Sequence, residues 1–166
     1  MNDGLVLYSN AGKTNKKGAE VEFNGKISDQ LNFEYAASIG NYKFESFKFI
    51  ENDFSNNLIP GIPKSQHNIK IKYKNESNFN LVVGLKRVGK MFADNANKTE
   101  IDGYSSINVK MSKNLNLFRT SITPFISIDN LFNKEYFDNI RINAFGSRFY
   151  EPAPGINFIG GLKLNL

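Results

Sequence analysis

Residues 121–166 read SITPFISIDNLFNKEYFDN from Ser121, IRINAFGSRFYEPAPG from Ile140 and INFIGGLKLNL from Ile156. Apolar and polar residues alternate at the start of this stretch and again at its end, a period of two that is typical of half-buried β-strands. An aromatic-rich segment with two arginines separates the two runs and closes with Pro152 to Gly155. The layout predicts two antiparallel strands joined by a long loop, as in the closing hairpin of a membrane β-barrel.

The same alternation extends over the rest of the chain, so we expect an all-β, antiparallel transmembrane β-barrel segment of about eight strands. The expected strands are 5–9, 19–27, 31–40, 67–74, 79–89 and 104–112, a seventh between 117 and 138, and a last one from 156. Short connections (28–30, 75–78 and 113–117) alternate with long ones (41–66, 90–103 and 138–155). Outer-membrane barrels have short periplasmic turns and longer extracellular loops in this alternation.

Alternation also assigns each strand residue to one of two faces. The residues expected to face lipid are Phe23, Ile69, Ile71, Tyr73, Phe158, Leu162 and Leu164. Those expected to face a water-filled lumen are Glu20, Glu22, Lys70, Lys72 and Lys163. Lysine-bearing faces would be costly in the core of a soluble sandwich, whereas a wet lumen tolerates them.

Composition limits the remaining classes. The 166 residues include 15 Phe and 7 Tyr but no Cys, so neither disulfides nor thiolate metal sites are available. No apolar run reaches the roughly 20 residues of a transmembrane helix. The net charge is +5, but the lysines are scattered along strands and turns. We therefore expect no nucleic-acid partner and interpret the charge as solvation of lumen and turns.

No motif supports an enzyme, a metal site or a cofactor. Gly84 to Met91 resembles a P-loop but has Met in place of the Ser or Thr that holds Mg²⁺, and no helix follows. Asp94 to Glu100 resembles a calcium loop but places Ala96 and Lys98 where oxygen ligands are needed. His67 is the only histidine and has no partners for a triad or a metal site.

Aromatic residues near strand ends suggest interfacial girdles, with ordinary core packing as the alternative. They are Tyr42, Phe44, Tyr73, Phe79, Phe92, Tyr104, Phe118 and Phe137. In the last loop, Arg141, Arg148, Phe149 and Tyr150 are candidates to contact an anionic, catecholate-like ligand. The alternative is packing within the loop, with an arginine paired to Glu151 and stacked aromatics.

Several segments resemble TonB-dependent receptors, and they occur in the order of that family. They are NAGKTNKKGAEVEF (10–23), LIPGIPKSQHNIKIKY (58–73), RVGKMFADNANKTEIDGYSSINVKM (87–111), DNLFNKEY (129–136) and YEPAPG (150–155). The resemblance implies the last strands of a 22-stranded barrel in the outer membrane of a Gram-negative bacterium. It also implies uptake of an iron-siderophore or a similar nutrient, driven by a TonB-type energy transducer.

The chain departs from the family pattern in ways that bear on its completeness. It shows no plug domain, no box for the energy transducer and no signal peptide, and it ends in Leu166 rather than an aromatic residue. We therefore expect residues 1–166 to be the C-terminal part of a receptor barrel, which would meet the transducer only through a missing N-terminal part. The alternatives are a stand-alone eight-stranded outer-membrane barrel and a soluble basic β-protein that binds nucleic acid or lipid.

Overall fold

The computed structural model describes residues 12–117 and 120–165, and all of its long elements are β-strands, which confirms the all-β antiparallel fold. The strands of the main sheet are β1 (Lys13–Lys26), β2 (Leu31–Ser46), β5 (Ser65–Lys74), β6 (Phe79–Val88), β9 (Tyr104–Lys113), β10 (Leu115–Leu117), β11 (Thr120–Asp129) and β14 (Asn157–Asn165). Small ribbons pair β3 (Lys48–Phe49) with β4 (Asn52–Asp53), β7 (Met91–Phe92) with β8 (Glu100–Ile101), and β12 (Phe137–Ile140) with β13 (Tyr150–Pro152). One 3-10 turn, η1 (Phe145–Ser147), lies between β12 and β13. None of these described elements is a helix long and apolar enough to cross a membrane.

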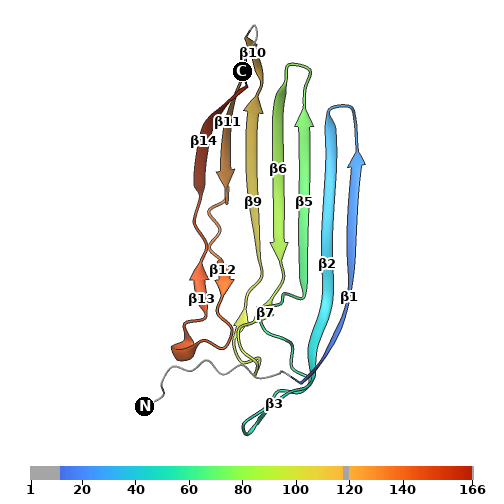
Figure 1. Ribbon diagram of the computed structural model, residues 1–166, viewed down its shortest axis with the longest axis vertical. Helices are drawn as coiled ribbons and strands as arrows, with labels where there is room; N and C mark the ends of the chain where they lie inside the picture. Colours follow the sequence, from blue (N-terminus) through green and yellow to red (C-terminus); the bar gives the residue numbers. More distant parts are fainter. Residues whose placement is uncertain (1–11, 118–119, 166) are drawn as a thin grey trace.

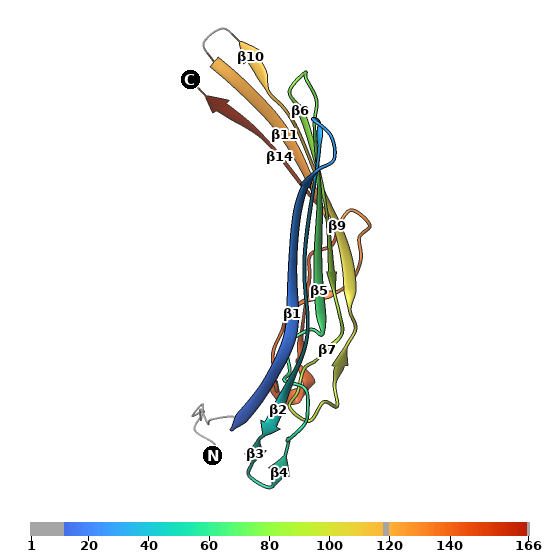
Figure 2. The ribbon, with the colours of Figure 1, turned by 90° about the vertical axis from the view of Figure 1, so that its right-hand side faces the viewer.

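The main sheet is an antiparallel meander in which each long strand pairs with the next one along the chain (Figure 1). Its eight strands occupy seven positions, because β9 and β10 lie in one line. Within the described residues, β1 pairs only with β2 and β14 only with β11, so the sheet stays open. Figure 2 shows that the sheet curves along its length.

The line of β9 and β10 is interrupted without a change of register. Ser112 of β9 lies opposite Phe125, and Leu115 of β10 lies opposite Ile122, so no residue is added or skipped between them. Pro124 stands in β11 at the break. Proline has no backbone N–H to donate, which explains the gap in the ladder.

The strand bounds agree with the predicted ones within about two residues for β5, β6 and β9, whereas β1 and β2 are longer. β1 has 14 residues and β2 has 16, because the polar stretch from Lys13 to Gly18 pairs with residues 40–46 although it lacks alternation. Both exceed the roughly 9–11 residues that a strand needs to cross a bilayer. The predicted strand 5–9 lies outside the described residues.

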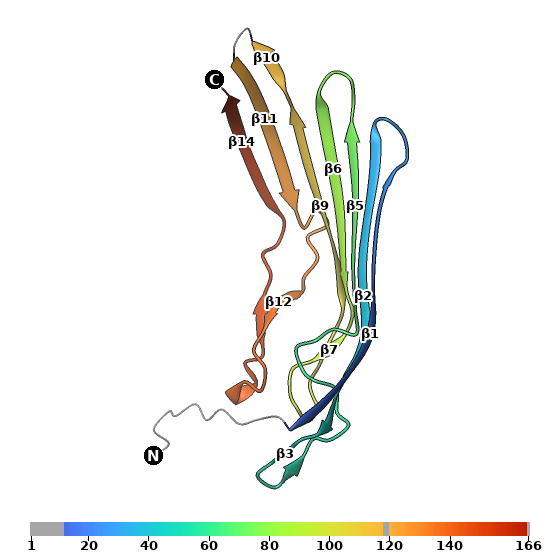
Figure 3. The same ribbon diagram turned by 45° about the vertical axis from the view of Figure 1, so that its right-hand side comes forward.

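The long connections gather at one end of the sheet, opposite the short turns (Figures 1 and 3). We call this the loop end. The segment between β6 and β9 bonds to both others: Gly61 N donates to Phe92 O (2.8 Å), and Asn143 N donates to Ala93 O (2.9 Å). Side chains add to these bonds, since Asn95 N donates to Oδ1 of Asn143 at 2.9 Å. The three connections therefore form one hydrogen-bonded body.

The buried hydrophobic residues lie at the loop end or on the strand segments that enter it. They are Phe44, Phe47, Val88, Ala93, Ile101 and Tyr104. Phe44 is 4% exposed and Tyr104 is 8% exposed, so the girdle prediction is wrong for these two. The long connections fold over the ends of β2 and β9 and bury aromatics that the sequence alone suggested for a membrane interface.

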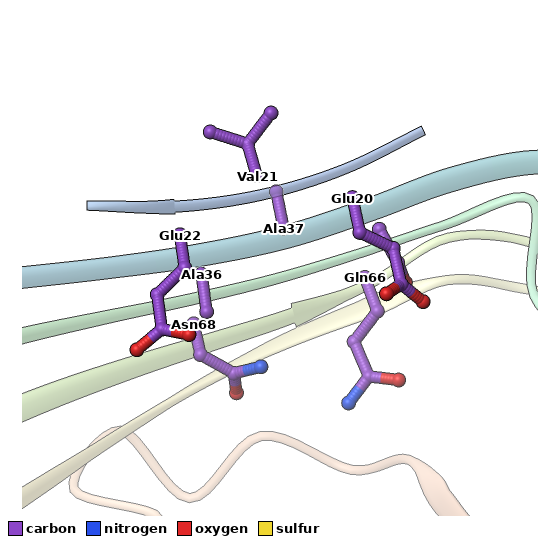
Figure 4. Close-up of a pocket in the computed structure, with 8 residues that line it drawn as sticks. Glu20, Val21, Glu22, Ala36, Ala37, Gln66 and Asn68 are labelled. Carbon is purple, nitrogen blue, oxygen red and sulfur yellow. The ribbon is translucent and has the colours of Figure 1, made fainter. Parts of the chain in front are cut away.

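The register of the ladders divides the strand residues between two faces, because directly opposite residues in a sheet share a face. Glu20, Glu22, Gln66 and Asn68 point to one side and Val21 to the other (Figure 4). We call the first side the polar face and the second the apolar face. Across β2, β5, β6 and β9, one row of the apolar face is Phe33, Ile71, Val83 and Val109.

Candidate functional site

The charged residues predicted for the lumen all lie on the polar face. Glu20 and Glu22 of β1 lie opposite Ser38 and Ala36 of β2. Both glutamates point to the same side as Gln66 and Asn68 (Figure 4). Lys70 and Lys72 lie on β5, and Lys163 lies on β14 opposite Thr123. The set is spread from one edge of the sheet to the other rather than gathered into one cluster.

Glu34 on β2 is the charged centre of this face, and sequence reasoning missed it. Its carboxylate forms ion pairs with Lys72 and, at 3.5 Å, with Lys70. β2 and β5 place Glu34 opposite Lys70 and Asn32 opposite Lys72, so the carboxylate lies between the two ammonium groups. The signal was present in the sequence, since Glu34 follows the same alternation as Asn32.

Farther along the polar face, lysines lie over aromatic rings. Lys110 Nζ is 5.1 Å from the centroid of Phe125, and Lys86 Nζ is 5.8 Å from the centroid of Tyr104. Both distances fit cation–π attraction. Within the described residues, neither lysine forms an ion pair with a carboxylate. These ammonium groups give the polar face an excess of positive charge.

Two shallow concavities hollow the polar face. Glu20, Glu22, Ser38, Gln66 and Asn68 contribute to the first (Figure 4). Glu34, Lys70, Lys86 and Asn108 contribute to the second, which adjoins it along β2, β5 and β6. Hydrogen-bonding and charged side chains line both concavities together with apolar residues such as Ala36 and Leu85.

The residues predicted to face lipid all lie on the apolar face. Ile69, Ile71 and Tyr73 follow one another along β5, and Phe23 on β1 lies opposite Tyr35. On β14, Phe158, Leu162 and Leu164 lie opposite Ile128, Pro124 and Ile122 of β11. Phe23 is 55% exposed and Leu162 is 70% exposed, although both side chains are large and hydrophobic. This face therefore presents a wide apolar surface.

The last long connection packs against itself as the alternative interpretation of its arginines predicted. Arg141 Nη2 lies 2.5 Å from Oε1 of Glu151, and Nε of the same guanidinium donates to that oxygen at 2.7 Å. The hydrogen bond from Asn139, followed by the hydrogen bond and charge of Arg141, lowers the pKa of Glu151. Phe137 stacks on Tyr150 with ring centroids 4.4 Å apart, and Phe149 meets Tyr150 edge-on at 6.0 Å.

Arg148 differs from Arg141. It is exposed, and none of the ion pairs found in residues 12–117 and 120–165 includes it. Among the four loop candidates, Arg148 is the cation that has no carboxylate partner in the described part of the chain.

Asn130 holds the base of this connection. Its backbone N–H donates to Oδ1 of Asn108 at 2.9 Å, and its Nδ2 donates to the carbonyls of Lys134 (2.9 Å) and Pro154 (3.2 Å). Its Oδ1 accepts from Lys134 N at 2.8 Å. Asn130 is 4% exposed and has a positive φ of 52°. One side chain therefore ties the DNLFNKEY segment to the Pro-Ala-Pro-Gly turn.

Asn133 completes this joint. Its Oδ1 accepts a hydrogen bond from Ile156 N at 2.9 Å. A Cβ at Gly155 would lie 2.6 Å from the same Oδ1, so only glycine leaves room for the contact. Two of the five segments on which the family resemblance rests, 129–136 and 150–155, thus meet in space and are joined by hydrogen bonds.

A cleft opens beside this joint, between the β8–β9 corner and the DNLFNKEY segment. Glu100, Asp102, Tyr104, Tyr136 and Phe137 contribute to its lining. The rings of Tyr104 and Tyr136 stack with centroids 3.9 Å apart and planes 17° apart. Burial, followed by the charge of Asp138, raises the pKa of Tyr136. The cleft combines carboxylates with aromatic surface. The sequence alone suggested girdle positions for Tyr104 and Phe137 and a ligand-binding role for none of these five residues.

His67 lies on the apolar face, where its Nδ1 is 3.0 Å from the Tyr35 hydroxyl. No group of three or more His, Asp or Glu side chains suited to a metal ion occurs within the described residues. His67 thus has a hydroxyl neighbour rather than the carboxylate or second histidine of a metal or catalytic site.

With this geometry in place, comparison with known proteins identifies the family. The family described as TonB dependent receptor-like, beta-barrel matches residues 1–131. The chain belongs to this family. The family is one of transport receptors rather than enzymes.

Individual relatives agree with this assignment. The ferrioxamine receptor of Yersinia enterocolitica is 25% identical over 137 residues, which are 79% of this chain and 18% of the relative. The chain thus spans less than a fifth of that receptor's length. The siderophore receptor PiuA from Acinetobacter baumannii has the same fold, with a TM-score of 0.75 and 20% identity over 93% of this chain and 22% of that one. The ferric citrate transporter FecA gives a TM-score of 0.79 at 18% identity, with coverages of 93% and 25%.

Proposed function

We propose that residues 1–166 form the C-terminal part of the barrel of a TonB-dependent receptor that takes up an iron-siderophore across the outer membrane of a Gram-negative bacterium. The observation that carries the proposal is the separation of one broad antiparallel sheet into an apolar and a polar face. The family match and the printed functions of its relatives support the nutrient class.

The apolar face is proposed to meet lipid and the polar face the lumen. A lipid-facing surface has no water to exclude, so large exposed side chains such as Phe23 and Leu162 are stabilised there rather than destabilised. Open strand edges are not tolerated in a bilayer. We therefore propose that β1 and β14 pair with further strands of a longer chain, as in a closed barrel of 22 strands.

The ligand is proposed to contact the loop end. Arg148 supplies a guanidinium with no carboxylate partner in the described part of the chain, and Phe149 and Tyr150 supply aromatic surface beside it. Arg141 is proposed to act by holding the β12–β13 ribbon through Glu151, and only indirectly on the ligand. The energy transducer would act on a part of the receptor that lies outside these 166 residues.

The test is uptake of ⁵⁵Fe by cells that carry or lack the gene, under iron limitation, with ferric hydroxamate, ferric catecholate and ferric citrate supplied in turn. We expect the deletion to abolish uptake of one of the three and to leave the others unchanged. Uptake that is the same in both strains for all three chelates would overturn the assignment to iron-siderophore transport.

A second measurement tests the proposed membership of a larger barrel. An antibody to residues 138–155 should detect, in the native outer-membrane fraction, a polypeptide several times larger than 18.8 kDa. A heat-modifiable band at 18.8 kDa would instead favour the stand-alone eight-stranded barrel.

A further inference from the structure

The apolar face is interrupted near the loop end by a group of polar side chains from neighbouring strands. His67 of β5 lies opposite Arg87 of β6, and Arg87 lies opposite Ser105 of β9. Tyr35 of β2 joins them through its hydroxyl, 3.0 Å from Nδ1 of His67, and the two rings are stacked at 6.2 Å. Directly opposite residues share a face and lie about 5 Å apart at Cβ, so these groups can reach one small anion together.

The position of this group marks where the apolar surface ends on β5 and β6. The next row toward the short turns contains Ile69, Leu85 and Ile107, and the row after it contains only hydrophobic residues. On β5 and β6, the residues beyond His67 and Arg87 toward the loop end are Gln66, Ser65 and Val88, and then the loops begin. On β5 and β6 the polar group therefore lies at the loop-side boundary of the apolar surface, whereas on β2 the exposed Ile39 lies one row nearer the loop end.

The described part of the chain does not balance the positive charge of Arg87. Arg87 is exposed, and none of the ion pairs formed within residues 12–117 and 120–165 includes it. The residues that share the apolar face of β5, β6 and β9 include no Asp or Glu. A guanidinium beside apolar surface is stabilised by an anion that accepts several of its N–H groups, and phosphate matches its planar fork.

From this placement we infer that Tyr35, His67, Arg87 and Ser105 form a binding site for the headgroup phosphate of an anionic lipid. The acyl chains lie along the hydrophobic rows toward the short turns, and the phosphate meets Arg87 at their end. The Tyr35 hydroxyl donates to Nδ1 of His67, which leaves Nε2–H as a donor to the same phosphate. The inference rests on the proposed function, since it takes the apolar face to meet lipid.

The test uses the full-length protein in neutral detergent, with bisphosphorylated lipid A as the probe and native mass spectrometry as the readout. Wild type should bind the lipid, and Arg87→Gln should weaken binding by about tenfold or more, since a charged hydrogen-bonded pair is lost. Arg87→Lys should retain part of the affinity, because lysine keeps the charge but not the fork. Lys110→Gln, on the opposite face, is the matched control and should bind as wild type.

Two further experiments distinguish a lipid phosphate from free phosphate and provide a second variant in case the first one misfolds. Dephosphorylated lipid A should bind as weakly to wild type as the phosphorylated lipid binds to Arg87→Gln, and millimolar inorganic phosphate alone should not replace the lipid. Where Arg87→Gln fails to assemble, the double variant Tyr35→Phe with Ser105→Ala keeps the guanidinium and should weaken binding several-fold.

Unchanged binding in the variants overturns the inference, as does equal binding of the dephosphorylated lipid or full replacement by inorganic phosphate. Heat-modifiable assembly and ⁵⁵Fe uptake of the wild type are measured in parallel. A wild-type protein that assembles and transports iron but does not select the phosphorylated lipid refutes the lipid site alone. A protein absent from the outer membrane refutes the proposed function instead.

Discussion

The loop end and the strands below it are stabilised in different ways. At the loop end, buried aromatics such as Phe44 and Tyr104 and side-chain hydrogen bonds of asparagines hold the connections together. Along the strands toward the short turns, large hydrophobic side chains such as Leu162 remain exposed. The loop end therefore has its own small core, whereas the strands depend on what surrounds the sheet. The following tests vary one region while leaving the other intact.

The largest effect is expected from a charge on the apolar face. Leu162→Arg should impair assembly into the outer membrane by about 2–4 kcal/mol if the site lies near the bilayer midplane. Lys163→Arg, one residue along β14 on the polar face, is the matched control and should have little effect. On β5, Ile71→Arg should likewise impair assembly and Lys72→Arg should not. The heat-modifiable fraction of the protein in outer membranes measures assembly. Equal assembly of both variants of a pair would contradict the assignment of the faces.

The next effect is expected at the joint formed by Asn130. Asn130→Ala should lower the free energy of unfolding by about 1–3 kcal/mol, because the carbonyls of Lys134 and Pro154 lose the donor that the buried Asn130 side chain supplies. Alanine is also disfavoured at the positive φ of this position. Urea unfolding of the refolded protein measures the change. Asn32→Ala, at an exposed position on the polar face, should stay within about 0.5 kcal/mol of wild type.

A smaller effect is expected where the first two long connections meet. Oδ1 of Asn97 accepts from Leu58 N at 2.7 Å, and its Nδ2 donates to Leu58 O at 2.9 Å. Asn97→Ala should therefore cost about 1 kcal/mol and expose residues 47–64 to protease. Limited proteolysis followed by mass spectrometry shows the cleavage sites. Lys98→Ala, at the exposed neighbouring position, is the control. Cleavage as fast in this variant as in Asn97→Ala would argue against a role of the Asn97–Leu58 hydrogen bonds.

The smallest effect concerns pH and the β12–β13 ribbon. Because Asn139 and Arg141 lower the folded-state pKa of Glu151, the ionised carboxylate stabilises the ribbon above the ordinary glutamate pKa of about 4.3. This stabilisation is lost as pH falls through the lowered folded value. Protease cleavage within 138–155 should therefore accelerate toward acid in wild type. Arg141→Gln should begin to loosen at a higher pH, and identical profiles for the two proteins would contradict the role of the pair.

The strands could be predicted because their side chains alternate between the apolar and the polar face of the sheet. The alternation from His67 to Lys74 gave β5 its face and nearly its bounds. Lys13 to Gly18 gave no such signal, because the end of β1 is polar on both sides and is held mainly by the ladder to β2. Alternation appears only where one face of a strand is apolar and the other polar. The length of a strand that continues where both faces are polar is therefore underestimated from sequence.

The candidate site was only partly predictable for a related reason. Glu20 and Lys70 follow from alternation. An arginine paired to Glu151 was one of two interpretations of the last loop, but which arginine forms the pair depends on the β12–β13 ribbon, whose pairing shifts register and has no periodic signal. The burial of Tyr104 under Tyr136 depends on how a connection folds back over the sheet, which strand spacing does not specify. Contacts between connections are fixed by single asparagines, and one sequence does not show which asparagine meets which carbonyl.

Pro124 has a consequence for how insertions and deletions act on this chain. Since the register against β11 is the same on both sides of the break, the side chains of β9 and β10 keep their faces although the ladder is interrupted between the two strands. The register of the strand pairing is therefore continuous across the gap. One residue inserted between Lys113 and Asn114 would shift β10 by one step against β11 and turn Leu115 from the apolar to the polar face. Two inserted residues would return Leu115 to the apolar face. Whether an insertion there has an odd or an even number of residues therefore matters more than its length.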